Sequence, residues 1–420
     1  MNTTHRQLGM MTAFGAIALA AFAMAAGPQP ARAEDKTVTI GIGLPLTGAD
    51  ADSATRIKNG ALMAIDEINA TGSAGGYKLE VTVLDSGTAT AGQYDPAQAA
   101  TNAKKFVADP KVVALIGPEM SGEGKAMTPI LSAANLATIT PSSTNPDITN
   151  PKFAGQYKPG GKAIYFRTVT TDAYQGPNMA NYMKDALKVK SVYILDDSGA
   201  YGVGMSNLYE AQAKKIGMNV MGHDQLDPKE ADYTTIITKI KGLNPDAVYY
   251  GGVAQAGVKV AKQLHDIFPT VLKAGGDGMV DGGLLSGVGF PAIEGWYCTQ
   301  ASPHVMDDAD MTQWVANYTK AYNMTPSDYA ITAYDAVMVI GDAIKRVSAS
   351  GKPVNRDTVR DSIQATVLTT LQGPVSFDEN GDIINKVISV FQITHDAKYP
   401  EDDVQHQYKY IGVASESPAS

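Results

Sequence analysis

The sequence has a single cysteine, Cys298, so no disulfide can form within the chain. Small exported domains often depend on disulfides for stability, and this chain must rely on a large buried core instead. Cys298 directly follows Trp296 and Tyr297. We therefore expect its thiol to be buried and unreactive.

Histidine is also scarce, and the motifs of common enzyme classes are missing. The six histidines are scattered, with no spacing typical of metal ligands. The sequence has no G-x-S-x-G nucleophile elbow and no P-loop. Gly41 and Gly43 begin a dinucleotide-type pattern, but Leu46 stands where its third glycine belongs. We expect neither enzymatic activity, nor a cofactor, nor a metal.

Basic residues are outnumbered by acidic ones, and the formal net charge is -9. This balance argues against nucleic-acid binding, which needs a basic face. Beyond the first 33 residues, no apolar run reaches the roughly 18 residues that a membrane span requires.

The N-terminus has the pattern of a secretory signal peptide, which we place at residues 1–33. Arg6 precedes a long apolar stretch, Pro28 and Pro30 interrupt it, and residues 31–33 form an Ala-x-Ala cleavage site. The alternative is an uncleaved membrane anchor, which the prolines and the cleavage site disfavour. The segment has no cysteine for lipid attachment. We expect an exported, soluble protein, with a net charge of -11 after loss of Arg6 and Arg32.

The remaining chain is too long for one core, which favours two lobes. Strand and helix patterns alternate from residue 37, pause near residue 165, and then restart. This rhythm predicts two α/β lobes, each with a doubly wound parallel sheet, joined by several crossovers. We assign residues 34–165 and 296–374 to the first lobe and 166–295 and 375–412 to the second, with a flexible tail at 413–420. A cleft between hinged lobes can close around a ligand.

Hydroxyl residues follow two neighbouring strands expected in the first lobe. Ser121 comes after the strand at 112–116, at the position where a helix N-cap is expected, and Ser142 and Thr144 come after the strand at 136–140. Ligands bind at the carboxyl ends of strands in open α/β sheets, and helix N-termini there favour anions. These residues predict a carboxylate-binding site. The alternative is that they only cap a helix and form a turn.

Asp277 and Tyr201 follow strands expected in the second lobe and would face the same cleft. A fixed carboxylate at Asp277 suits an ammonium group, although turn formation is the alternative interpretation. One lobe would then bind the negative end of a zwitterion and the other its positive end. The pattern predicts an α-amino acid as the ligand.

The chain resembles the periplasmic leucine/isoleucine/valine-binding proteins of ABC importers along essentially all of its exported part. The resemblance is carried by residues 43–48 (GLPLTG), 60–69 (GALMAIDEIN), 116–121 (IGPEMS), 139–144 (ITPSST), 249–252 (YYGG) and 377–381 (FDENG). It implies a type I periplasmic binding fold, in which three crossovers join two lobes that close like a Venus flytrap.

The resemblance also implies roles for individual residues. Ser121, Ser142 and Thr144 match positions that hold the ligand's carboxylate and amino groups, and Asp277 matches an acid that holds the ammonium. Tyr201 matches a cleft tyrosine, and Tyr329 an aromatic residue that closes the side-chain pocket. Three positions depart from the family pattern: Ser53 replaces a large aromatic residue, Val253 a tyrosine, and Met120 a cysteine of a disulfide.

The function implied is that of a monomeric substrate-binding protein that delivers a branched-chain, aliphatic or somewhat larger amino acid to a membrane permease driven by two ATPase subunits. The three departures from the family pattern leave open which ligand side chain the protein prefers. Relatives of this fold also bind aromatic acids, amides and urea. A ligand sensor for a membrane receptor would use the same closure.

Overall fold

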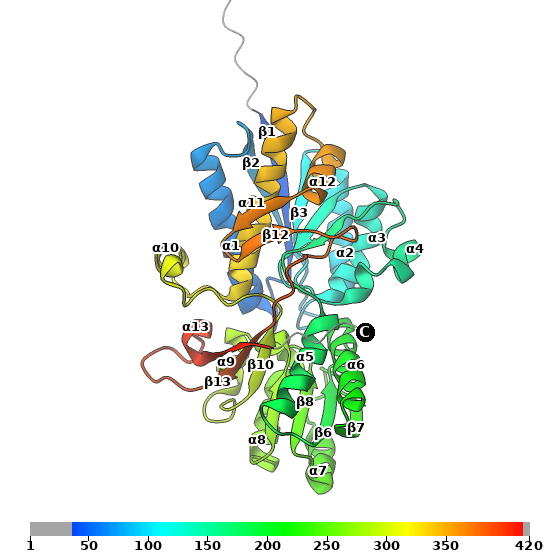
Figure 1. The fold of residues 1–420 in the computed structure, drawn as a ribbon, viewed down its shortest axis with the longest axis vertical. Helices are drawn as coiled ribbons and strands as arrows, with labels where there is room; N and C mark the ends of the chain where they lie inside the picture. The colour runs from blue at the N-terminus through cyan, green and yellow to red at the C-terminus, as the bar shows by residue number, and fades with distance from the viewer. Residues whose placement is uncertain (1–35, 415–420) are drawn as a thin grey trace, which may run out of the picture. The chain divides into compact units, whose positions relative to one another are not determined.

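A computed structural model describes residues 36–414. Lys36 begins a compact unit that contains every helix and strand described below. The expected signal peptide and residues 415–420 of the expected tail lie outside the described residues. Two sheets of mainly parallel strands organise this unit, as Figure 1 shows. The predicted α/β class is therefore confirmed.

The first sheet has five parallel strands in the order β2-β1-β3-β4-β5. Its central strands are apolar on both faces because helices cover both sides of a parallel sheet. The strands are β1 (Thr37–Leu44), β2 (Lys78–Asp85), β3 (Val112–Ile116), β4 (Ala137–Thr140) and β5 (Tyr165–Arg167). The helices of this lobe are α1 (Ala51–Thr71), α2 (Pro96–Ala108), α3 (Ser121–Ala133), α4 (Ala154–Tyr157), α10 (Thr312–Tyr322), α11 (Asp328–Ala349) and α12 (Arg356–Gln364).

The second sheet has seven strands in the order β14-β13-β10-β9-β8-β6-β7. Its strands are β6 (Ser191–Asp196), β7 (Asn219–Gln225), β8 (Ala247–Gly251), β9 (Leu272–Gly275), β10 (Tyr297–Gln300), β13 (Ser389–Ile393) and β14 (Tyr408–Val413). The helices are α5 (Asp172–Asp185), α6 (Ala200–Lys215), α7 (Thr234–Leu243), α8 (Ala254–Ile267), α9 (Gly282–Val288) and α13 (Val404–Gln407). A separate hairpin pairs β11 (Val367–Thr370) with β12 (Gly373–Ser376).

The two sheets repeat one strand order. The first runs 2-1-3-4-5, and the parallel part of the second runs 7-6-8-9-10. In each sheet the chain first adds a strand on one side and then moves to the other side. The carboxyl ends of β1 and β3, and of β6 and β8, therefore flank topological switch points, where open α/β sheets form ligand crevices.

The structure moves two of the expected lobe boundaries. Tyr297–Gln300 forms β10, which pairs with β9 and β13 in the second sheet, so the chain returns to the first lobe after Gln300 rather than at residue 296. Phe377 still contacts Phe166 of the first lobe, with ring centroids 5.1 Å apart, although we assigned residue 375 onward to the second lobe. β14 reaches Val413, inside the expected tail. Periodicity locates strands but does not identify their pairing partners, which explains these differences.

The helices α1 and α11 pack side by side against the first sheet (Figure 1). Gly60 of α1 lies at their contact, where a methyl group would overlap the backbone carbonyl of Ala330 in α11. The absence of a side chain therefore sets how closely the two helices approach. Because Tyr329 immediately precedes Ala330, this packing also positions one wall of the cavity described below.

We predict that Gly60→Ala lowers the free energy of unfolding by about 1–3 kcal/mol, because the added methyl group has no space between the helices. The matched control is Gly242→Ala in α7, where an added methyl group would contact nothing within 4 Å. Removing a helical glycine there should stabilise the protein by roughly 0.5–1 kcal/mol. Denaturant unfolding of both variants measures the contrast, and equal effects of the two substitutions would contradict the packing argument.

Candidate ligand-binding site

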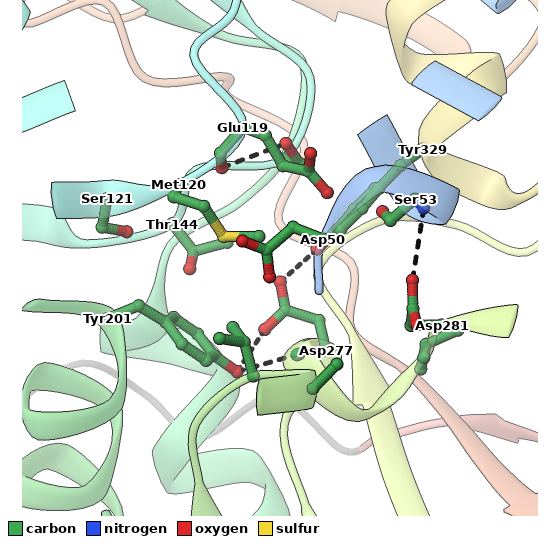
Figure 2. A pocket seen from close by; sticks show the side chains of 15 residues that line it. Asp50, Ser53, Glu119, Met120, Ser121, Thr144, Tyr201, Asp277, Asp281 and Tyr329 are labelled. Carbon is green, nitrogen blue, oxygen red and sulfur yellow. Dashed lines mark hydrogen bonds between the residues drawn. The ribbon is translucent and has the colours of Figure 1, made fainter. Parts of the chain in front are cut away.

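A cavity with a free volume of about 50 Å³ lies between the carboxyl ends of the strands of the two lobes. A single water needs roughly 10–15 Å³ on this measure, so the cavity suits a small molecule. Figure 2 shows side chains from both lobes around it. It is lined by every residue that the sequence predicted for the site: Ser53, Met120, Ser121, Ser142, Thr144, Tyr201, Val253, Asp277 and Tyr329.

The N-terminus of α3 forms one wall of the cavity. The N-cap is Met120, and Ser121 is the first helical residue, so the expectation that Ser121 is the N-cap was wrong by one position. The buried Ser121 hydroxyl accepts a hydrogen bond from the backbone N–H of Asn145 at 3.2 Å and keeps its own proton to donate. Together with the partial positive charge of the helix N-terminus, this wall suits an anion.

The loop after β4 supplies the next two hydroxyl groups. Ser142 donates a hydrogen bond to the backbone carbonyl of Glu119 at 3.2 Å. The Thr144 hydroxyl is buried and lines the cavity; it lies close enough to the buried Asp172 carboxyl to lower the pKa of that group, although no well-formed hydrogen bond joins them. Buried polar atoms normally have a partner, so this hydroxyl is available to a bound molecule.

Asp277 faces these hydroxyls from the second lobe and is held by three donors. Tyr201 donates to Oδ1 at 2.6 Å, Gln175 donates to the same oxygen at 2.9 Å, and Tyr329 donates to Oδ2. Tyr201 is the second residue of α6 in the second lobe, whereas Tyr329 is the second residue of α11 in the first lobe. The Asp277 carboxyl is therefore oriented from both lobes. Burial raises its pKa despite these hydrogen bonds.

The cavity also has acidic residues that the sequence reasoning missed. Asp50, Glu119 and Asp281 line it in addition to Asp277, while Ala254, Gly278 and Val280 complete the wall. Asp50 follows β1, Glu119 follows β3 and Asp281 follows β9. The rule that located Ser121 and Asp277, a polar residue after the carboxyl end of a strand, could have identified these acids too.

Asp50 and Glu119 each have one carboxyl oxygen without a partner. Asp50 is 2 % exposed, and its Oδ2 accepts the backbone N–H of Tyr94 at 2.8 Å, but its Oδ1 has no partner among the described residues. Glu119 is 5 % exposed, and its Oε2 likewise has none, although the Ser53 hydroxyl lies close enough to the carboxyl to lower its pKa. No lysine, arginine or histidine belongs to the described lining of the cavity. The wall opposite these oxygens thus supplies no positive charge.

Burial without a basic partner favours the protonated form of these carboxyls. It raises the pKa of Asp50 to about 7, with the nearby Asp197 adding to the effect. Burial also raises the pKa of Glu119 well above its usual value, and Asp50 contributes. For Asp281, burial and the neighbouring Asp52 raise the pKa to about 7.

Asp281 joins helix N-termini from the two lobes. Its Oδ1 accepts the backbone N–H of Leu284 in α9 at 2.5 Å, and its Oδ2 accepts the backbone N–H of Ser53 in α1 at 3.2 Å. A further bond between the lobes runs from the Asn145 side-chain amide to the backbone carbonyl of Ala200 at 2.9 Å. The lobes are thus in contact on more than one side of the cavity, which is the arrangement expected of a closed cleft.

Two other kinds of site were also sought in the described part of the chain. Among residues 36–414, no group of three or more His, Cys, Asp or Glu residues is arranged to hold a metal ion. Within the same range, the helices are too short or too polar for any of them to cross a membrane. Cys298 is fully buried, and burial raises the pKa of its thiol, as expected for an unreactive cysteine.

Comparison with known proteins identifies the family. Residues 37–398 match the periplasmic binding protein family model. The chain is 29% identical over 348 residues to the Leu/Ile/Val-binding protein BraC3 of Rhizobium johnstonii, covering 83% of this chain and 89% of that protein. The crystal structure of a leucine-binding protein from Thermotoga maritima is 25% identical, has a TM-score of 0.77, and covers 90% of this chain and 98% of its own.

The same fold also binds a different ligand class elsewhere. A solute-binding protein of an ABC transporter from R. palustris, solved in complex with benzoate, has a TM-score of 0.73 and 19% identity, covering 90% of this chain and 97% of its own. At that identity the likeness concerns the fold alone. The resemblance inferred from the sequence motifs is confirmed at the level of family and fold.

We predict that the ligand-free protein is less stable at pH 8 than at pH 5. Asp50 and Asp281, with pKa values near 7, and Asp172, whose burial raises its pKa to about 8, keep protons in the folded state that they lose when unfolded. The folded state then binds more protons, so the free energy of unfolding falls as pH rises through this window. Thermal unfolding at pH values between 5 and 8 measures this fall in stability.

The matched variant for this prediction is Asp50→Asn, which keeps the shape of the side chain and removes its titration. The loss of stability between pH 5 and pH 8 should be smaller in this variant, whereas replacing the exposed Asp266 should leave it unchanged. Stability that rises with pH across this window would refute the role assigned to the buried acids.

Proposed function

Because this chain belongs to the family of periplasmic binding proteins, we propose that it binds an α-amino acid in the cavity between its lobes and delivers it to the permease of an ABC importer. One observation carries the proposal: the cavity has opposite chemical poles on its two sides. Hydroxyls and a helix N-terminus lie on the first lobe, and the oriented carboxyl of Asp277 lies on the second.

At the first pole, Ser121 and Thr144 would donate hydrogen bonds to the ligand's carboxylate, supported by the N-terminus of α3. Ser142, whose hydroxyl proton is donated to the backbone carbonyl of Glu119, would accept a hydrogen bond from the ligand's amino group through its remaining lone pairs. Hydrogen bonds to charged groups contribute roughly 1.5–3 kcal/mol each. Several of them, reduced by ordering costs, are compatible with micromolar binding, which corresponds to about 8 kcal/mol.

At the second pole, the ligand's ammonium would bind Asp277. The positive charge of the ammonium compensates the buried carboxylate of Asp277 and favours the ionised form of this side chain. The three existing donors already orient the carboxylate. Because Tyr329 reaches Asp277 from the first lobe, this pole is complete only when the lobes are closed. Ligand binding and closure are thereby coupled, and a permease can distinguish the loaded form from the empty one.

The remaining parts of the proposal follow from the family. Relatives named as Leu/Ile/Val-binding proteins and a leucine-binding protein of similar structure support an amino-acid ligand. We propose a periplasmic location, a monomer, and a membrane permease with ATPase subunits as the partner. The protein would carry out no reaction itself. A receptor that reads the same closure is the alternative use of this scaffold.

An aromatic acid, as in the R. palustris complex, is the alternative ligand. Its carboxylate would suit the first pole, but its ring would face Asp277 and the other acids without supplying donors. The acidic lining therefore favours a ligand that carries an amine. A thermal-shift screen of the twenty amino acids, aromatic acids and short amides identifies the ligand. A ligand at a concentration a hundredfold above its Kd raises the free energy of unfolding by about 2.7 kcal/mol.

We predict that Asp277→Asn weakens amino-acid binding at least tenfold, because the neutral amide cannot compensate the ligand's ammonium. Isothermal titration calorimetry with the amino acid found by the screen measures this change. The matched control is Asp335→Asn, which alters another buried acid that is bonded to Thr370 and Leu371 and does not line the cavity. Unchanged affinity in the Asp277 variant would remove the ammonium assignment.

We further predict that Thr144→Val weakens binding of the same amino acid by roughly 5- to 30-fold, the loss expected for one charge-assisted hydrogen bond. Valine keeps the shape of threonine and removes only the unpartnered hydroxyl. Thr128→Val serves as the control, because the hydroxyl of Thr128 donates within α3 to Gly124 at 2.6 Å. If both variants bind as the unmodified protein does, the Thr144 hydroxyl has no part in recognition.

A further inference from the structure

We infer that the side chain of the ligand ends in a nitrogen group that donates hydrogen bonds, an ammonium or an amide, and that Asp50 and Glu119 accept them. This inference rests on the amino-acid ligand proposed above and specifies its side chain. It departs from the branched-chain or aliphatic side chain that the sequence resemblance implies.

The two unpartnered carboxyl oxygens carry the argument. Asp50 Oδ1 and Glu119 Oε2 are buried, lack partners among the described residues, and belong to side chains that line the cavity. Leaving a buried polar atom without a partner destabilises the folded protein. Burial favours the protonated carboxyls in the ligand-free cavity, whereas a ligand that supplies N–H donors favours the ionised form, in which both oxygens accept.

The positions of these acids leave the side chain of the ligand as their partner. Ser121 and Thr144 can donate to the ligand's carboxylate, and Asp277 with its two tyrosines forms the ammonium pole. Asp50 and Glu119 line the same cavity from the first lobe, and in Figure 2 the Asp50 side chain lies between Met120 and Asp277. An amino acid held at both poles would place its side chain against the remaining polar lining, which includes Asp50 and Glu119.

An aliphatic side chain would bury these oxygens against methyl groups and leave them unsatisfied. Sites that hydrogen-bond a polar group reject analogues lacking it far more strongly than apolar pockets discriminate by size. The lining thus favours a polar side chain over a branched aliphatic one.

The charged groups around Asp50 determine how binding depends on pH. Asp50 is faced by Tyr94 and Asp197, by Glu119 and Glu123 near the start of α3, and by Asp281 from α9. Arg56 lies close by, but its guanidinium is paired with Asp52 at 2.8 Å. An ammonium needs an ionised acceptor, so its affinity should rise between pH 6 and pH 8 as protons leave Asp50. A neutral amide should show a weaker dependence.

Two pairs of amino acids with matching shapes test the inference by calorimetry. Asparagine and leucine have side chains of the same branching, and ornithine and norleucine have chains of the same length. In at least one pair we expect the nitrogen-bearing member to bind tenfold or more tightly than its aliphatic partner. The pH dependence between pH 6 and pH 8 then distinguishes an ammonium, represented by ornithine, from an amide, represented by asparagine.

Variants of the two acids provide the second arm. Glu119→Leu should reduce the preference for the nitrogen-bearing member at least tenfold, and Asp50→Asn should remove the rise in ornithine affinity with pH. Glu119→Gln keeps the size and polarity of the side chain and serves as the conservative variant if leucine perturbs folding. With glutamine at this position, ornithine binding should weaken more than asparagine binding.

Leucine and norleucine binding as tightly as their partners or more tightly would overturn the inference. If Asp277→Asn still abolished that binding, the proposed amino-acid function would stand while the side-chain assignment fell. Binding of none of these amino acids, nor of any of the twenty in the thermal-shift screen, would overturn both proposals. An unchanged preference in the Glu119→Leu variant would show that Glu119 does not receive the side chain.

Discussion

The bonds that Asp277 makes to Tyr201 and Tyr329 connect the two halves of this protein through one buried carboxyl group. Tyr201 belongs to the second lobe and Tyr329 to the first, so the carboxyl has its full set of donors only when the lobes meet. Burying a carboxyl is costly unless it is hydrogen-bonded and compensated by charge. The same group therefore stabilises the closed arrangement and creates the need for a cationic partner within it.

The topology explains why so many polar groups meet in one place. Each lobe repeats the strand order that creates a switch point, between β1 and β3 in one sheet and between β6 and β8 in the other. Loops leave the sheets at these points and start helices, so hydroxyls, carboxyls and helix N-termini gather there. When two such edges face each other, one fold lines a cavity with hydroxyls, carboxyls and helix N-termini from both lobes.

The acidic lining lies in parts of the chain that the fold does not depend on. Asp50, Glu119 and Asp281 lie in loops, where substitution leaves the sheet cores intact. Burial raises the pKa values of all three, so that protonation, ligand binding and stability would be linked through the same buried groups. In the site proposed above, a ligand without hydrogen-bond donors would leave these carboxyls without partners, which would contribute to selectivity.

The sequence by itself determined the alternation of strands and helices, the two α/β lobes and the hydroxyls that follow the strands at 112–116 and 137–140. These features depend on local periodicity and on the chemistry at strand ends, which neighbouring residues specify. Only the tertiary structure decided that Tyr297–Gln300 pairs in the second sheet and that Asp281 accepts the backbone N–H of Ser53. It also decided that Asp50 and Glu119 share one cavity, because strand pairing and lobe closure arise from contacts between residues far apart in the chain.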